Sequence, residues 1–165
     1  MGCTSGLFAP YTIEELEMEV AKIAPRLPVA ELMNGGIIKL EGANGVFNPN
    51  SLLDPSWLKG RMTGDEYFQA ISYINKCAAC SHVGLSKMYS TTERPMRLQL
   101  LTNAGMAAVQ QLNENHKSVR FTYQPTIEDT MINTSYQTDQ FSRYAQRSGP
   151  PVAHATKVML YIAPQ

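Results

Sequence analysis

The sequence has 165 residues, of which 44% are hydrophobic and 17% are charged, and this suits one domain with an apolar core. Its 14 Lys and Arg residues balance its 14 Asp and Glu residues, so the composition gives no electrostatic reason to expect nucleic acid and argues against a polybasic patch for acidic lipids. The sequence contains neither a membrane-spanning run of about 18 apolar residues nor the basic start and long apolar stretch of a secretory signal.

The first residues form a candidate acylation site. Removal of Met1 would leave Gly2 at the N-terminus, although Gly6 stands where the strict myristoylation pattern has Ser or Thr. A single myristoyl chain anchors a protein weakly, and stable attachment needs a second lipid. The thiol of Cys3 can carry that lipid as palmitate. We therefore expect residues 1–11 to be a lipid-anchor segment acylated at Gly2 and Cys3, and an unmodified N-terminus is the alternative.

A short amphipathic helix is predicted next. Thr12 and Glu15 form a capping box, in which the Thr side chain and the Glu side chain each accept a hydrogen bond from the other's backbone N–H. Apolar residues then recur at helical spacing until Pro25 ends the helix, and a linker follows to residue 30. The polar face of this helix is acidic, so we expect it to pack on the domain or on a partner rather than on a membrane.

Two more helices are predicted within residues 31–165. Thr63 and Glu66 form a second capping box, and the apolar pattern after it extends to about Cys80. Pro95 can open the third helix, which should end within residues 113–116. Gly105 interrupts the apolar face of that helix, which predicts close approach of another helix or backbone at this position.

Three strands complete the prediction. Residues 36–41 have the composition of a strand, and after the turn signal of residues 42–45 a short return strand can begin at Val46. Residues 119–124 and 157–162 alternate between apolar and polar side chains, as half-buried strands do. The segment between the last two strands is polar and without strong periodicity, so we expect a long functional loop at residues 126–151. The fold class is therefore α+β: a single domain over residues 31–165, with a small antiparallel sheet and two or three helices packed on one face.

The Cys77-Ala78-Ala79-Cys80 motif has several interpretations. A redox dithiol usually stands at the start of a helix, where the helix dipole stabilises a thiolate, but this pair stands late in the predicted helix. A structural zinc would need two further ligands, and His82, His116 and His154 form no second paired motif. Two buried structural cysteines, or palmitate sites at Cys77 and Cys80, remain as interpretations that suit a helix.

The sequence offers no further motif for catalysis. It has no nucleophile elbow, no phosphate-binding glycine loop and no paired-histidine metalloprotease motif. The glutamates of the first helix are spaced as a solvated face, and the three histidines are expected at surface or capping positions. We therefore predict no catalytic residues, no metal and no cofactor, and expect that the protein is not an enzyme.

Residues 36–163 resemble the family that includes golgin subfamily A member 7 and the cysteine-rich hydrophobic domain proteins. The resemblance is one of order and spacing: a strand, a helix with an aromatic near its start, a cysteine pair, a second amphipathic helix, a long connection and an apolar strand. The corresponding segments read GDEYFQAI (64–71), NKCAAC (75–80), VQQLN (109–113) and KVMLYI (157–162). The resemblance implies a membrane-associated, noncatalytic protein with lipid on Cys77 or Cys80, and some family members are accessory subunits of palmitoyltransferases or trafficking components.

These observations lead to one main hypothesis and two alternatives. The protein is expected to be a lipid-anchored scaffold or accessory protein on the cytoplasmic face of a Golgi, endomembrane or plasma membrane. Its partners would be the membrane itself, through the acyl chains, and a protein such as a palmitoyltransferase, met by residues 12–24 or 126–151. The alternatives are a small-molecule or lipid-binding module and a soluble structural subunit of a larger assembly.

Overall fold

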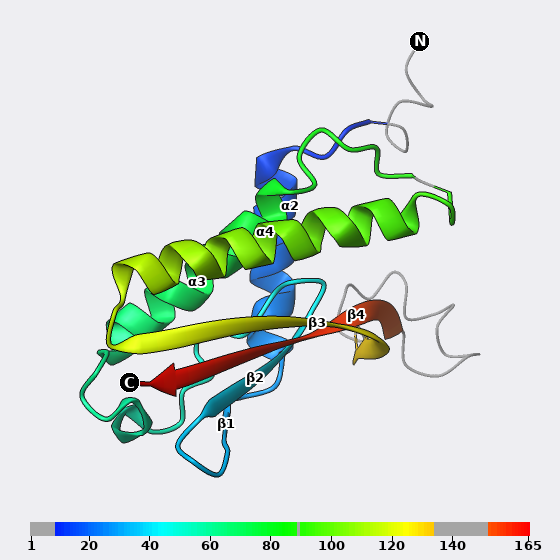
Figure 1. The fold of residues 1–165 in the computed structure, drawn as a ribbon. Helices are drawn as coiled ribbons and strands as arrows, with labels where there is room; N and C mark the ends of the chain where they lie inside the picture. Colours follow the sequence, from blue (N-terminus) through cyan, green and yellow to red (C-terminus); the bar gives the residue numbers. More distant parts are fainter. Residues whose placement is uncertain (1–8, 89, 134–151) are drawn as a thin grey trace.

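The computed structural model describes residues 9–88, 90–133 and 152–165, and it confirms the α+β class. Three α-helices contact a four-stranded antiparallel sheet with the strand order β1-β2-β4-β3. The helices are α2 (Ile13–Ile23), α3 (Gly64–Cys80) and α4 (Arg94–Asn115), and the strands are β1 (Glu31–Leu32), β2 (Ile38–Ala43), β3 (Val119–Asn133) and β4 (Val152–Pro164). Both α3 and α4 lie on the same side of the sheet, and α4 runs along β3 (Figure 1).

The sheet has one apolar face and one largely polar face. Opposite residues in the ladder are Ile38 and Ile162, Leu40 and Leu160, and Phe121 and Ile162, and all of these side chains are buried. Residues between them, such as Arg120 and Thr122, are exposed. Because successive strand side chains point to opposite faces, this alternation directs the apolar residues of three strands toward the helices.

Local sequence explains where two of the helices begin. The predicted capping boxes are present at Thr12 and Glu15 before α2 and at Thr63 and Glu66 before α3. The side chain of Tyr67 is buried in the first turn of α3, and its hydroxyl lies 2.6 Å from the hydroxyl of Ser51. The main core is then completed by residues one and two helical turns further along α3, including Ile71 and Ile74.

Asn75 is a buried polar residue on α3 that holds the chain after β2. Its amide Nδ2 donates to the carbonyl oxygen of Phe47, and its Oδ1 accepts from the backbone N–H of Phe47, each over 2.8 Å. Phe47 itself is fully buried in the core. Since neither backbone group of Phe47 can reach water, the side chain of Asn75 takes the place of a strand neighbour.

Three features of the sheet differ from the sequence prediction. Residues 126–133, expected in the long loop, belong to β3, where a register shift between Pro125 and Asp129 breaks the apolar alternation. Residues 31–32, β1, form a strand too short to show a pattern. Val46, where a return strand could begin, makes only an isolated bridge to Ala43. The rest of the expected loop, residues 134–151, lies outside the described residues.

We predict that Asn75→Ala lowers the free energy of unfolding by about 3 kcal/mol, because it leaves both backbone groups of Phe47 buried without partners. The measurement is urea-induced unfolding. Asn103→Ala is the matched control, because Asn103 is exposed on α4 and should change stability by less than about 0.5 kcal/mol. Equal losses in the two variants would contradict the role given to Asn75.

We predict that Gly105→Ala also destabilises the protein, by about 1–2 kcal/mol. A Cβ at Gly105 would collide with the ring of Tyr123 on β3, so the close neighbour is a side chain of a strand rather than the helix or backbone that was predicted. The collision should outweigh the roughly 1 kcal/mol that alanine gains in a helix. Gly64→Ala at the start of α3 meets no neighbouring atom and should be neutral or slightly stabilising. Thermal unfolding of both variants checks this, and a stabilised Gly105→Ala would refute the close contact.

Candidate functional site

The two cysteines of the predicted pair differ in how far their side chains are buried. Cys77 is half-buried and packs against the main core, whereas Cys80, the last residue of α3, is exposed. A hydrogen bond with Cys77 raises the pKa of Tyr73, one turn earlier on α3. Cys80 is therefore the more accessible thiol. The other two predicted attachment sites, Gly2 and Cys3, lie outside the described residues.

The start of the described chain is bound to the segment that follows Cys80. The N–H of Tyr11 donates to the carbonyl of Leu85 over 2.8 Å, and the N–H of Gly84 donates to the carbonyl of Tyr11 over 2.9 Å. An ion pair of 2.6 Å between Lys87 and Glu15 adds a side-chain contact. We call residues 9–11 and 82–87 the N-terminal junction, and the two segments lie together in Figure 1.

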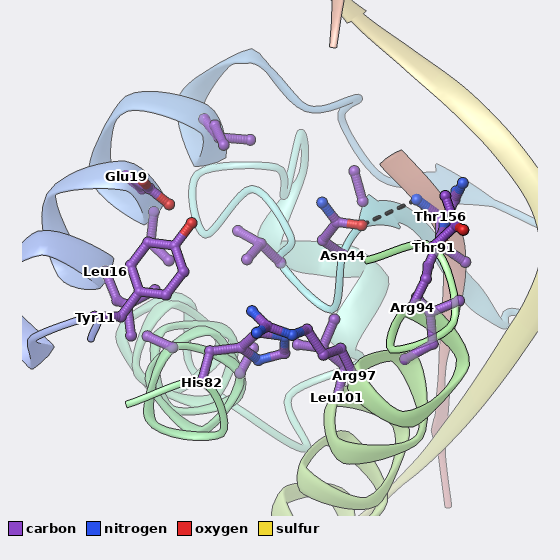
Figure 2. Close-up of a pocket in the computed structure, with 17 residues that line it drawn as sticks. Tyr11, Leu16, Glu19, Asn44, His82, Thr91, Arg94, Arg97, Leu101 and Thr156 are labelled. Atoms are coloured by element: carbon purple, nitrogen blue, oxygen red, sulfur yellow. Dashed lines mark hydrogen bonds between the residues drawn. The ribbon is translucent and has the colours of Figure 1, made fainter. Parts of the chain in front are cut away.

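A hollow in two compartments lies beside this junction, between α2, the end of α3, the first half of α4 and the sheet. The first compartment has a volume of about 460 Å³. The second, of about 530 Å³, lies toward β3 and shares Asn44, Arg94, Leu98, Leu101 and Thr156 with the first. Asn44 is held at this boundary, since its Oδ1 accepts from the N–H of Thr156 over 3.0 Å (Figure 2).

The first compartment combines an apolar floor with charged side chains. Nine of its 17 lining residues are aliphatic, and they come from all three helices, from the last residue of β2 and from the turn after β2. They include Leu16, Val20, Ile23, Ala78, Ala79 and Leu101. Figure 2 shows Tyr11 and Glu19 on the α2 side, Arg94 and Thr91 opposite them, and His82 and Arg97 between. The volume of about 460 Å³ lies within the usual range of small-molecule pockets.

Burial shifts two of the titratable groups in this lining. It raises the pKa of Glu19, and the nearby charge of Glu15 raises it further. Burial also lowers the pKa of His82, and the positive charge of Arg97 adds to this effect. Both shifts disfavour the charged form of the side chain, as expected where water is partly excluded.

The sequence analysis missed the two arginines of this site. Arg97 is only 4% exposed, its Nη1 donates to the carbonyl of Ser86 over 2.8 Å, and its Nη2 lies 3.5 Å from Glu93. Arg94 and Arg97 stand four residues before Leu98 and Leu101, respectively, so they continue the apolar face of α4 toward its N-terminus. The alignment of these two arginines with the apolar face of α4 was the signal in the sequence that could have identified them as lining residues. His82 is half-buried and also lines the first compartment, which the sequence analysis did not predict.

Within residues 9–88, 90–133 and 152–165, no three His, Cys, Asp or Glu residues are grouped so that they could hold a metal ion. None of the helices in these ranges is long and apolar enough to cross a membrane. Comparisons of the chain with protein-family models, with curated proteins and with solved structures found no match. The proposed function below is therefore inferred from the sequence and from the arrangement of the described residues.

We predict that His82 makes the stability of the protein depend on pH. Its lowered pKa in the folded state means that the unfolded chain, with a histidine pKa near 6.5, binds the proton first on acidification. The contribution of His82 to stability is complete above pH 6.5 and is lost as the pH falls through the folded-state pKa. Urea unfolding between pH 7.5 and 5 should therefore show a steeper loss in the wild type than in His82→Gln. Equal slopes would contradict this.

Proposed function

We propose that the protein is a lipid-anchored, noncatalytic scaffold or accessory protein on the cytoplasmic face of a membrane. The observation that carries the proposal is the N-terminal junction. Its backbone hydrogen bonds hold residues 9–11 on the segment that follows Cys80. The attachment sites predicted from the sequence are Gly2 and Cys3, and the Cys77 and Cys80 pair. Residues 9–11 follow the first two sites and residues 82–87 follow the second pair, and the junction holds these two segments together at one end of the domain.

Chain length supports this arrangement. Cys3 stands six residues before Ala9, and six residues span at most about 20 Å, so an acyl chain on Cys3 would stay near the junction. Cys80 stands four residues before Gly84, which is bonded to Tyr11. Lipids on Cys3 and Cys80 would therefore enter the same patch of membrane, which supplies the second signal that stable anchoring requires.

The surface between Cys80 and α4 also suits a membrane interface. Val83 is 46% exposed and Met88 is 50% exposed, and both belong to the segment between Cys80 and α4. Exposed apolar side chains next to an acylated cysteine would bury their surface among the lipid headgroups and chains. We assign Cys80, rather than the half-buried Cys77, as the acylated member of the pair.

The proposed protein partner is a palmitoyltransferase, as the family resemblance implies. An accessory subunit of such an enzyme acts without chemistry of its own, by holding a partner in a stable conformation at the membrane. The acidic exposed face of α2 is the surface we propose for that contact, since its capping box and buried Leu16 fix the helix on the domain.

The first experiment measures intact mass and membrane partitioning of the protein from its native cell, beside Gly2→Ala and Cys3→Ser variants. A myristoyl increment on the wild type, absent together with membrane association in Gly2→Ala, is the expected result. Cys3→Ser should keep the myristoyl increment and partition only partly to membranes, because one acyl chain binds weakly and reversibly. An unmodified wild type whose location ignores both substitutions would refute the anchor and favour a structural subunit.

Cys80→Ser and Cys77→Ser form a matched pair for the second attachment site. Hydroxylamine-sensitive acylation should fall in Cys80→Ser and persist in Cys77→Ser, because only the first of these thiols is exposed. Equal acylation in both variants would overturn the assignment of Cys80. Recovery of a palmitoyltransferase with the wild type, and its loss in a variant reversing the charges of Glu14 and Glu17 on α2, would support the proposed partner.

A further inference from the structure

We propose that the first compartment of the hollow binds the acyl chain of Gly2 when the protein is away from the membrane. The hollow and the bilayer would then compete for the same hydrocarbon chain. The inference rests on the acylation of Gly2 in the proposed function, and it adds the site that this chain occupies within the protein.

The floor of the first compartment presents apolar side chains that the fold leaves only partly buried. Val20 and Ile23 on α2 and Leu101 on α4 line it, and all three pack on the smaller of the two core clusters, which includes Ala43 and Ala78. A hydrocarbon chain in the compartment would remove the remaining apolar surface of these side chains from water. The gain in free energy is proportional to the apolar area that is buried, so the floor favours an aliphatic occupant.

The polar groups of the lining favour an occupant without charge. The buried Arg97 donates to the carbonyl of Ser86 and is ion-paired with Glu93. Arg94 also has an interaction partner, and the lowered pKa of His82 favours the neutral form of its ring. A charged ligand would have to take a partner from one of these groups, because a charge in a partly dry site needs compensation. An acyl chain joined to the protein through an amide brings no charge into the compartment.

The N-terminal junction holds the start of the described chain beside this compartment. Tyr11 is bonded to the segment after Cys80 and also lines the compartment (Figure 2). Gly2 stands seven residues before Ala9, and seven residues span at most about 25 Å, so an acyl group on Gly2 stays within reach of the compartment. A group tethered over so short a distance has an effective concentration of about 1 mM, which favours it over a free lipid of equal affinity at lower concentration.

The bilayer is a weak competitor for a single acyl chain. A myristoyl group alone binds membranes reversibly, with an association constant of about 10⁴ M⁻¹, so a compartment of moderate affinity can retain it. Cys3 is the next residue after Gly2, and a palmitoyl group on Cys3 would keep both residues at the bilayer. Acylation of Cys3 would therefore draw the first chain out of the hollow and stabilise the membrane-bound state.

The test uses the full chain with an isotope-labelled myristoyl group attached to Gly2 in vitro and the thiol of Cys3 unmodified, in solution without lipid. Isotope-filtered NOE spectra should connect the acyl chain to the methyl groups of Val20, Ile23 and Leu101. An acyl chain without NOEs to these methyl groups would overturn the inference. Because the chain is attached in vitro, this result does not depend on acylation in the native cell, so a failure of the anchor and a failure of the hollow are distinguished.

Val20→Trp and Met18→Trp form a matched pair for the competition with the bilayer. Val20→Trp should fill the compartment and expel the chain, so the acylated variant should bind phosphatidylcholine vesicles about threefold more than the acylated wild type. Met18→Trp, at a position 59% exposed on the same helix, should match the wild type. The unacylated form of each protein gives the vesicle binding of the tryptophan itself, which is subtracted. Equal vesicle binding of the acylated wild type and acylated Val20→Trp would refute the inference, and the NOE measurement decides the matter if Val20→Trp does not fold.

Discussion

The paired hydrogen bonds between Asn75 and the backbone of Phe47 are the interaction on which the rest of the structure depends. They replace a strand neighbour for the chain that leaves β2, and they do so from the buried face of α3. The turn before Phe47 is fixed as a result, with Asn44 and Gly45 at positive φ and Asn44 bonded to Thr156 of β4. This turn forms the boundary between the two compartments of the hollow, so the shape of the hollow follows from a single buried amide on a helix.

Much of the fold was readable in the sequence because its signals are local. The capping boxes at Thr12 and Thr63 involve residues three apart, and they begin helices where the structure has them. The cost of Gly105 in a helix indicated close packing at this position, but the neighbour is the ring of Tyr123 on β3 and not the helix or backbone that was predicted. The part of β3 before residue 125 and the part of β4 after residue 156 follow from alternation, which is also local.

The remaining features arise from contacts between distant segments. The outer part of β3 is paired with β4 after a register shift, and its polar sequence carries no strand pattern of its own. The hollow requires α2, α3, α4 and the turn after β2 to meet, and no window of the sequence contains them all. The sequence analysis assigned no role to Asn75, whose backbone partner Phe47 stands 28 residues away in the chain. The proposed anchor residues Gly2 and Cys3 precede the residues that the structure describes, so the anchor stays a prediction from the sequence.

The strand order has a consequence for how the protein is made. The central strand β4 joins β2 to β3, yet it comes from residues 152–164, more than a hundred residues after β2. Contacts of such long sequence separation slow folding, and the sheet cannot close on a ribosome before β4 has emerged. During that interval β2 and β3 present unpaired edges, while Gly2, the proposed acylation site, has already been synthesised. An acyl chain added at that stage would bring the unfinished domain to the membrane before its sheet is complete.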